Sequence, residues 1–389
     1  MSPNLVEDGV LENTALGVSA LSANTTGFSN AAVGYGALKA NTSAFQNTAV
    51  GAWALNSTTT GSANTALGVG ALQTNTTGHH NTALGLGALS SNLAGFSNVA
   101  SGYGALSHNS GSENTAAGYE ALRFNTTGFW NTADGFKALF LNTTGTRNTA
   151  SGVLALGANT TGQFNTAAGA YAIQANTAGN YNTGSGYLAL FASTTGNNNT
   201  ATGAQALTAN TTGSNNTALG LNALLANTTG TNNTASGLGA LGANTTGDWN
   251  VAAGSSAGAN ATAGSYNVFL GANVTGSAAD TNTIRIGTPY DAAGAGGPTG
   301  QSQTFIAGIH GAQLSGPAVL VFVDANGQLG TVTAPPITGS GTVDPAAGAP
   351  SPDDIPLGRL VEAQAARIAE LETRLKRLEG LMDQTRPRR

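Results

Sequence analysis

The sequence predicts an all-β protein, built as a narrow parallel β-roll or solenoid of about sixteen coils and followed by a C-terminal α-helical coiled coil. Two observations support this fold class. An Asn recurs every seventeen residues from Asn13 to Asn267, with one step of sixteen between Asn98 and Asn114. An apolar heptad pattern then runs through residues 357–382. A fixed period indicates stacked repeat units, and heptads indicate helices that pack against one another.

The composition agrees with a regular stack and excludes several classes of protein. Only 8% of the 389 residues are charged, against about 25% in ordinary globular proteins. The absence of cysteine excludes disulfides and thiolate metal sites. The repeat region carries four basic residues and no basic stripe, so we expect no nucleic-acid partner. No run of eighteen apolar residues occurs, and we expect no direct membrane insertion.

The seventeen-residue unit is too short for a helical or leucine-rich repeat and fits one coil of a narrow β-solenoid. Its consensus is N-T-A-L-G-x-x-A-L-x-x-N-T-T-G-x-x. We expect the N-T-A-L segment to form one strand, and the later A-L segment with its neighbours to form a second. The Gly four residues after the Asn is present in all sixteen coils. We expect this Gly and the N-T-T-G segment to form the two corners, because Gly and Asn tolerate left-handed backbone angles.

Stacking places equivalent residues of successive coils in columns about 4.8 Å apart. Asn columns can form amide ladders, and twelve coils carry a second Asn eleven residues after the first. The Ala and Leu columns are expected to fill the thin interior. Three residues after the Asn, Leu16 and Leu67 give way to Ser101 and Asp134 in later coils. We interpret this change as the sign of a partly wet face between chains.

The segments outside the repeat are assigned from composition and motifs. We divide the chain into residues 1–12 (N-terminal lead-in), 13–281 (β-roll repeats), 282–333 (β-rich connector), 334–355 (Pro- and Gly-rich linker), 356–384 (coiled coil) and 385–389 (basic tail). No capping segment is recognisable before the first coil, so its open edge is expected to need protection. Within the connector, Asp324-Ala325-Asn326-Gly327 predicts a hairpin turn.

The helix predicted from Pro356 carries one seam of residues at alternating four- and three-residue steps. Gln364 is the polar exception: either it fixes the register of the helices, or it marks a frayed and wet first turn. Leu360 and Leu381 broaden the seam, which favours three chains over two. The predicted trimerisation residues are Leu357, Val361, Gln364, Ile368, Leu371, Leu375, Leu378 and Met382.

The segments Asn47-Thr48-Ala49-Val50-Gly51 and Asn81-Thr82-Ala83-Leu84-Gly85 are similar to the coil motif of trimeric autotransporter adhesin heads, the YadA-like left-handed parallel β-roll. The resemblance covers residues 13–281. It implies a left-handed roll, a homotrimer in which each chain forms its own roll, and binding to host or matrix surfaces. The coil here is longer by the Asn-Thr-Thr insert, and we recognise neither an export signal nor the family's membrane barrel. The connector, with Phe305-Ile306-Ala307-Gly308-Ile309, resembles segments of phage tail-fibre-like proteins.

No catalytic constellation is recognisable, so we expect a protein that is not an enzyme and uses no cofactor or metal. His79 and His80 stand side by side in the variable corner before Asn81, where a solvated turn is favoured over a metal site. Aromatic residues recur in the two positions before the repeat Asn, where they either cover a corner or contact a ligand. The candidate ligand-contact aromatics are Phe28, Phe45, Phe96, Phe129, Trp130, Phe164, Tyr181, Trp249 and Tyr266.

We therefore expect a non-enzymatic trimeric fibre or head protein for cell-surface adhesion or attachment, located outside the cell, on a cell surface or on a virion. Its partners would be further copies of itself and a host or matrix protein or glycan surface. A purely structural tail-fibre-like spike or shaft shares every feature except the ligand. An ice-binding solenoid is a third alternative, because Thr follows the repeat Asn in twelve coils. In the other four, Ala31, Val99, Val251 and Val268 indicate a packed column instead.

Overall fold

The computed structural model describes residues 5–8, 12–287, 322–323 and 329–330. The predicted linker, coiled coil and basic tail lie outside these residues, and so do the heptad positions from Leu357 to Met382. The strands are β1 (Leu5–Asp8), β2 (Asn13–Leu16), β3 (Ala31–Val33), β4 (Thr48–Val50), β5 (Thr65–Leu67), β6 (Thr82–Leu84), β7 (Val99–Ser101), β8 (Thr115–Ala117), β9 (Thr132–Asp134), β10 (Thr149–Ser151), β11 (Thr166–Ala168), β12 (Thr183–Ser185), β13 (Thr200–Thr202), β14 (Thr217–Leu219), β15 (Thr234–Ser236), β16 (Val251–Ala253), β17 (Val268–Leu270), β18 (Ile284–Ile286), β19 (Phe322–Val323) and β20 (Leu329–Gly330).

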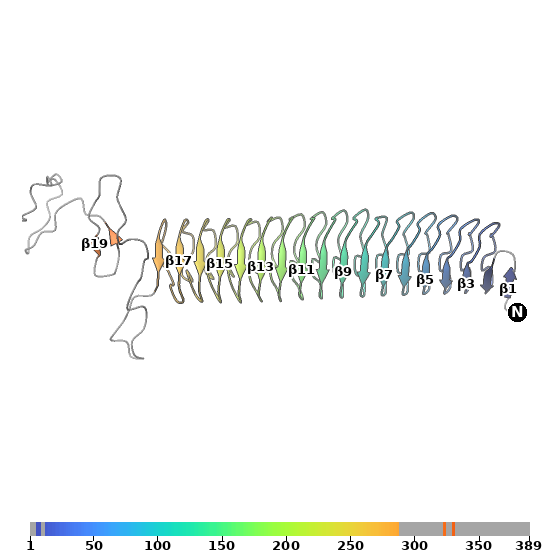
Figure 1. The fold of residues 1–389 in the computed structure, drawn as a ribbon, viewed down its shortest axis with the longest axis horizontal. Helices are drawn as coiled ribbons and strands as arrows, with labels where there is room; N and C mark the ends of the chain where they lie inside the picture. The colour runs from blue at the N-terminus through green and yellow to red at the C-terminus, as the bar shows by residue number, and fades with distance from the viewer. Residues whose placement is uncertain (1–4, 9–11, 288–321, 324–328, 331–389) are drawn as a thin grey trace, which may run out of the picture. The chain divides into compact units, whose positions relative to one another are not determined.

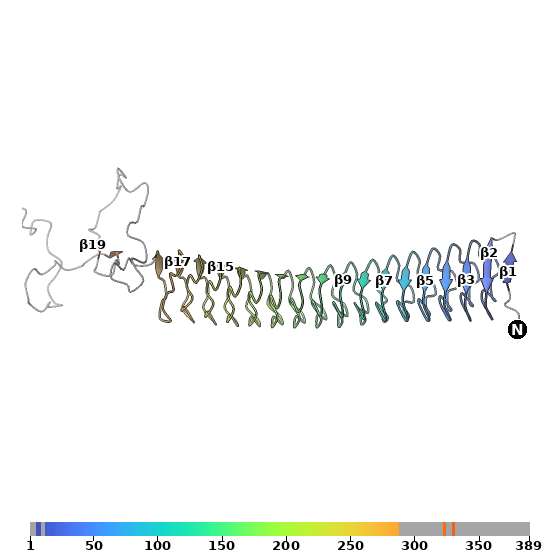
Figure 2. The ribbon, with the colours of Figure 1, turned by 90° about the horizontal axis from the view of Figure 1, so that it is seen from below.

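The chain divides into two compact units, residues 1–301 and residues 302–389. The described part of the first unit is a parallel β-solenoid in which each coil contributes one short strand (Figure 1). Strands β2 to β18 pair in order and in register, so that Thr149 of β10 lies beside Thr166 of β11. This arrangement confirms the predicted solenoid of about sixteen coils with a seventeen-residue period. Figure 2 shows the strands along one side of the stack and the turn segments on the other.

Each strand follows the alternation expected of an extended chain. In β10, Thr149 and Ser151 are exposed while Ala150 between them is buried. Successive strand residues point to opposite faces, so the Ala column faces the interior and the two flanking columns face outward. The corner Gly follows at once, as predicted, and its φ runs from +119° at Gly271 to +142° at Gly68. These angles are open to Gly and costly for other residues.

The predicted second strand of each coil is wrong. Ala155 and Leu156 are adjacent and both fully buried, whereas neighbouring residues of a strand would point to opposite faces. The backbone turns instead, because Leu156 adopts a left-handed conformation with φ of +51°. Its N–H donates to the carbonyl of Ala172 in the next coil at 3.0 Å, and its own carbonyl accepts from Asn159 N–H at 3.0 Å. These bonds and full burial stabilise an angle that a non-Gly residue seldom adopts.

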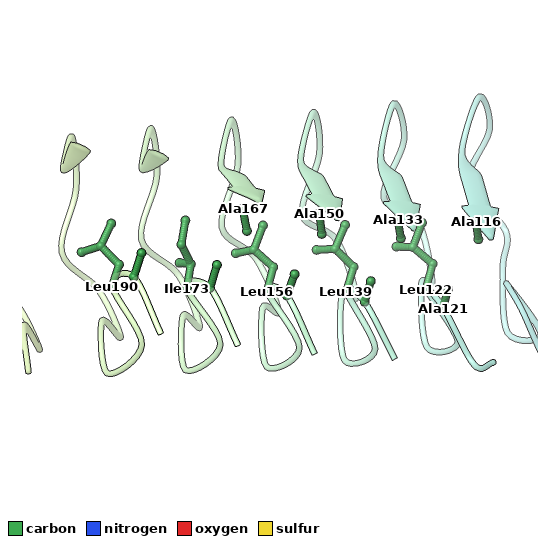
Figure 3. Close-up of a cluster of buried hydrophobic side chains, with 14 of the residues drawn as sticks. Ala116, Ala121, Leu122, Ala133, Leu139, Ala150, Leu156, Ala167, Ile173 and Leu190 are labelled. Carbon is green, nitrogen blue, oxygen red and sulfur yellow. The ribbon is translucent and has the colours of Figure 1, made fainter. Parts of the chain in front are cut away.

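The interior consists of one Leu column and two Ala columns, as predicted. Figure 3 shows Ala133, Ala150 and Ala167 on their strands facing Leu122, Leu139 and Leu156 of the turn segments. The Leu column from Leu38 to Leu241, with Ile173 in one place, is fully buried. Small Ala side chains on the strand keep the strand and turn segments close, while Leu supplies most of the buried apolar area. No single coil buries its own core, so stability arises from contacts between neighbouring coils.

Two buried Asn ladders run along the solenoid, as predicted. In the first ladder, Asn148 Nδ2 donates to Asn131 Oδ1 at 3.2 Å and to the carbonyl of Gly162 at 2.8 Å. Asn148 Oδ1 accepts the backbone N–H of Asn165 at 3.0 Å. In the second ladder, Asn159 Nδ2 donates to Asn142 Oδ1 at 2.7 Å and also to the carbonyl of Gly162, at 3.1 Å. The two ladders therefore meet at one carbonyl in each coil and close the turn around it.

The N-terminal edge of the solenoid is covered, contrary to the open edge expected from the sequence. β1 pairs with β2 in antiparallel orientation, with Val6 opposite Ala15. The outer hydrogen-bonding edge of β2 is thus occupied by the four residues of β1, and the edge that could template another strand is shortened. A segment of four residues carries too little pattern to be recognised from the sequence as a cap.

At the other end, the stack extends beyond the last predicted coil. β18 lies in the predicted connector, yet it pairs in parallel with β17 and places Ile284 beside Val268. Asp280 fixes this last turn: its carbonyl accepts from Asn267 Nδ2 at 2.9 Å, and its carboxylate accepts from Arg285 Nε and Nη2, each at 2.7 Å. The hydrogen bond from Arg285 is the main reason that the pKa of Asp280 lies below its ordinary value of 3.8.

In the second unit, the structure describes one two-stranded pair. β19 and β20 are antiparallel, with Val323 opposite Leu329. These strands flank the segment for which the sequence predicts a hairpin turn. Residues 324–328 themselves lie outside the described part of the chain.

Candidate binding surfaces

The outer face of the sheet carries two exposed columns on either side of the buried Ala column. The Thr column beside the repeat Asn is exposed, and so are Val99 and Val251, which replace Thr in two coils. In this single chain the column is thus a surface rather than the packed column that its apolar members indicated. In the second column, Leu67 is 50% exposed, whereas the interior Leu column is fully buried. The second column therefore remains available as a face between chains.

A third exposed column, which was not predicted, lies five residues after the repeat Asn, just past the corner Gly. We call this column the apolar stripe; it runs along the corner of the solenoid beside the column three residues after the Asn, which is apolar at Leu67 and Leu219 and polar at Ser101 and Asp134. A signal for it is present in the sequence, because the same seventeen-residue period places an apolar residue there in nearly every coil. Its large exposed members are Val18, Tyr35, Val69, Leu86, Tyr103, Tyr119, Phe136, Val153, Tyr187, Leu221 and Leu238.

Aromatic rings stack along the middle of the apolar stripe. Tyr103 and Tyr119 are nearly parallel with ring centroids 5.0 Å apart, and Tyr119 and Phe136 follow at 5.4 Å. Beside them, Glu120 is buried and pairs with Arg123 and with Lys137, whose Nζ lies 3.4 Å from Glu120 Oε2. Two cations thus share one carboxylate, and Arg123 Nε is buried without a hydrogen-bond partner, so the group keeps a net positive charge.

The candidate ligand-contact aromatics all lie exposed at the opposite corner, in the two columns before the repeat Asn. They do not form one continuous ladder. Phe28 stacks on Phe45, Phe164 on Tyr181 and Trp249 on Tyr266, while Phe129 and Trp130 meet edge to face. Phe96 stacks instead on His79. The structure thus divides the predicted set into separate clusters.

One of these clusters contains a cation. The guanidinium carbon of Arg147 lies 4.2 Å from the ring centroid of Trp130, 5.1 Å from that of Phe164 and 5.5 Å from that of Phe129. Trp130 belongs to the preceding coil and Phe164 to the following corner, so the guanidinium is held between rings on both sides. We call Phe129, Trp130, Arg147, Phe164 and Tyr181 the Arg147 corner.

The remaining sequence candidates carry no site. His79 and His80 are exposed with their Nδ1 atoms 3.1 Å apart. Within the part of the chain that the structure describes, no three His, Cys, Asp or Glu side chains are grouped so that they could hold a metal ion. The sequence Asn-Thr-Thr is also an acceptor motif for glycosylation, but Asn125 and Asn227 are fully buried in the second ladder and donate two hydrogen bonds each. These amides are therefore inaccessible to glycosylation in the folded chain.

Among residues 5–8, 12–287, 322–323 and 329–330, the structure contains no helix with the length and apolar character needed to cross a membrane. In the comparisons with known proteins, no family model, no curated protein and no solved structure matches this chain.

Proposed function

We propose that this chain is a non-enzymatic fibre or head protein that assembles as a homotrimer and serves in attachment to a surface outside the cell. The observation that carries the proposal is the apolar stripe. Soluble monomers rarely expose a contiguous apolar surface of this kind, and such surfaces mark places where another chain packs. A stripe that follows the axis of a straight solenoid suits parallel association of identical solenoids.

The resemblance of the Asn-Thr-Ala-Leu-Gly coil to YadA-like heads supports three chains and a left-handed roll. The predicted heptads of residues 357–382 agree with such an assembly, because a short coiled coil can hold together chains that already associate through another surface. The exposed aromatic clusters at the opposite corner stay free in such an arrangement. They supply the surface that would contact a host or matrix molecule.

The first test is the absolute mass of the purified chain in solution, by light scattering coupled to size exclusion. We expect three times the chain mass of 38.2 kDa. The double variant Leu86→Glu and Leu221→Glu places two charges on the apolar stripe and should reduce the mass toward that of one chain. Ser91→Glu, on an exposed position away from the stripe, is the matched control and should leave the mass unchanged. A monomeric wild-type chain would contradict the assembly.

Attachment itself is tested with beads that carry the assembled protein, offered to cells and to extracellular-matrix coatings. Specific retention of the beads supports the adhesive function. Retention on none of these surfaces, by a protein that forms the expected trimer, would identify a passive spike or shaft.

One observation favours a second candidate function. The Thr column on the flat strand face is exposed and regularly spaced, as a surface that orders water in an ice-binding protein must be. A thermal-hysteresis measurement decides between the two. A freezing-point depression that is lost when Thr149 and Thr166 are replaced by Lys would favour ice binding over attachment.

A further inference from the structure

The charged residues of the solenoid are concentrated in one place. Six of the eight charged residues between Asn13 and Gly271 lie in the stretch from Glu113 to Arg147. The coil that ends at Glu113, residues 98–113, has sixteen residues instead of seventeen, a length shared by the last step of the stack from β17 to β18. Stacking requires no charge, because most of the other coils stack without one, Lys39 and Asp248 being the two charged residues elsewhere between Asn13 and Gly271. This part of the surface therefore has a purpose beyond the stack.

Within this stretch, Arg147 is held in a fixed position. Trp130, Arg147 and Phe164 occupy the same column and share a left-handed backbone, with φ of 58°, 57° and 56°. Because the three side chains leave successive coils in the same direction, the guanidinium is confined between the two rings. Arginine is well suited to this position, since its flat, weakly hydrated head stacks on aromatic faces.

The hydrogen-bond donors of Arg147 have no acceptor of opposite charge in the described chain. The ion pairs found among residues 12–287 join Arg123 and Lys137 to Glu120, and Arg285 to Asp280. Rings of the preceding and following coils flank the Arg147 guanidinium, and its N–H groups take part in none of these ion pairs. A guanidinium presents these donors as a planar fork that binds a carboxylate through two parallel hydrogen bonds. Holding the fork in advance lowers the entropy lost on binding.

The residues next to Arg147 along its column and the adjoining one are rings and neutral polar groups, while Glu113 occupies the same column two coils earlier. Trp130 and Tyr181 are 48% and 58% exposed. The adjoining column carries Thr146 and Gln163, joined by a hydrogen bond of 3.2 Å. Asn180 follows in that column, and its Oδ1 accepts the backbone N–H of Gln163 at 2.8 Å. Apolar ring surface suits the C–H faces of a sugar, and amide and hydroxyl groups suit its hydroxyls, whereas an acidic peptide would offer fewer hydroxyls to match.

We propose that the Arg147 corner binds an acidic saccharide, with the sugar carboxylate on the Arg147 fork and the sugar ring against the exposed aromatic surface. The proposal rests on the attachment function proposed above and names the ligand class of one of its candidate surfaces. Arg147 is the specificity-determining residue, because it distinguishes a carboxylated sugar from its neutral counterpart. Lys137 is the natural comparison, since it is equally cationic but already pairs with Glu120.

The test is isothermal titration of the full chain with two pairs of probes. The first pair is an oligogalacturonate and its carboxyl-reduced, neutral form, and the second is sialyllactose and lactose. The pairs separate a uronate from a sialate as the source of the carboxylate, and an Asp-rich peptide serves as a third, non-sugar source. We expect the wild type to bind at least one acidic saccharide about tenfold or more tightly than its neutral partner, the usual size of a charge-assisted contact.

Three variants sharpen the test. Arg147→Gln should weaken binding of the acidic probe by about ten- to hundredfold, and Arg147→Lys should recover only part of it, because an ammonium keeps the charge and loses the fork. Lys137→Gln should bind as the wild type does. Circular dichroism melting curves of all variants establish that each is folded, since Arg147 is exposed and lies outside the buried ladders.

The proposal is overturned if the wild type binds neither acidic saccharide, if the neutral partners or the Asp-rich peptide bind equally well, or if Arg147→Gln binds unchanged. Beads carrying Arg147→Gln distinguish this failure from that of the proposed function. If those beads attach as well as wild-type beads, attachment stands without this ligand. If the soluble wild type binds the acidic saccharide and its beads attach to nothing, the ligand stands and the attachment function fails.

Discussion

The two Asn ladders lie side by side in the same coils, yet they differ in how much substitution they contain. The first ladder holds Asn in all sixteen coils, whereas four coils carry another residue at the second position, namely Thr58, Ser193, Ala261 and Ala278. The reason is the backbone. Each Asn of the first ladder accepts a buried backbone N–H from the next coil, as Asn148 does from Asn165. Asn142 in the second ladder accepts only a side-chain amide, from Asn159.

The interruptions of the second ladder leave a visible defect. Asn41 Oδ1 and Asn176 Oδ1 lie directly before Thr58 and Ser193 in this ladder, and both oxygens are buried without a hydrogen-bond partner. The hydroxyls of Thr58 and Ser193 are likewise buried and unpartnered. A missing hydrogen bond between two buried side chains lowers stability but is tolerated here. A buried backbone N–H without an acceptor is rare in proteins. The comparison indicates that Asn is retained in every coil where its side chain accepts a buried backbone N–H.

The largest effect is expected at a third invariant position, the corner Gly. Gly152→Ala would place a Cβ at 2.6 Å from the carbonyl group of Gly169, at a φ of +134° that disfavours any side chain. We expect a loss of about 3 kcal/mol or more in the free energy of unfolding, from overpacking and backbone strain together. Urea unfolding followed by circular dichroism measures it. Gly157→Ala in the same coil has ordinary φ and should change little; equal losses in the two variants would contradict this account.

The next effect compares the ladders directly. Asn148→Ala removes an amide that donates to Asn131 Oδ1 and to the carbonyl of Gly162, and it leaves the Asn165 N–H buried without an acceptor. We therefore expect a loss of about 3 kcal/mol in the free energy of unfolding. Asn142→Ala, six residues earlier, orphans no backbone donor and should cost about half as much.

Both Asn variants are measured by urea unfolding, with amide hydrogen exchange to read the Asn165 N–H specifically. That amide should exchange faster in Asn148→Ala and stay protected in Asn142→Ala. Equal stability losses and equal protection would mean that the backbone does not distinguish the ladders.

A smaller effect of opposite sign is expected on repairing the second ladder. Thr58→Asn supplies an amide that can donate to Asn41 Oδ1, and Ser193→Asn does the same for Asn176 Oδ1. Each should stabilise the solenoid by about 1 kcal/mol, the usual net value of one hydrogen bond. The control is Thr60→Asn, at an exposed position two residues away, which should leave the melting temperature unchanged. Destabilisation by the two repairs would show that the smaller side chains are required for packing.

The smallest effect concerns the end of the first ladder. There the carbonyl of Asp280 accepts the hydrogen bond from Asn267 Nδ2, as the carbonyl of Gly264 does from Asn250 Nδ2 in the coil before. The pKa of Asp280 is lowered in the folded chain, chiefly by the hydrogen bond from Arg285, so the ion pair stabilises the fold above the ordinary pKa of 3.8. The contribution is lost as the pH falls through the lower folded-state value. Hydrogen exchange of residues 267–287 should therefore accelerate at acid pH relative to residues 148–165. In Asp280→Asn this additional acid sensitivity should disappear, and its persistence would assign the effect to another group.

The period, the columns and the interior of this protein follow directly from its amino-acid sequence. Because a repeat of constant length stacks like on like, the Asn, Ala and Leu columns could be identified as ladders and core from the pattern alone. The same period located the aromatic candidates at one corner, but it left open whether they cover that corner or contact a ligand. The stripe five residues after the Asn is equally periodic, but a period does not reveal which columns face outward, and this column was not predicted.

The shape of the coil and the position of Arg147 depend on the stacked fold. The adjacent Ala155 and Leu156 are both buried, which forces a left-handed residue where the length of the repeat suggested a second strand. That conformation is stable only because coils above and below complete its hydrogen bonds, and a single repeat contains no such information. The direction of a side chain that leaves a left-handed residue is set in the same way. Consequently, the contact of Arg147 with rings seventeen residues before and after it emerges only from the stack.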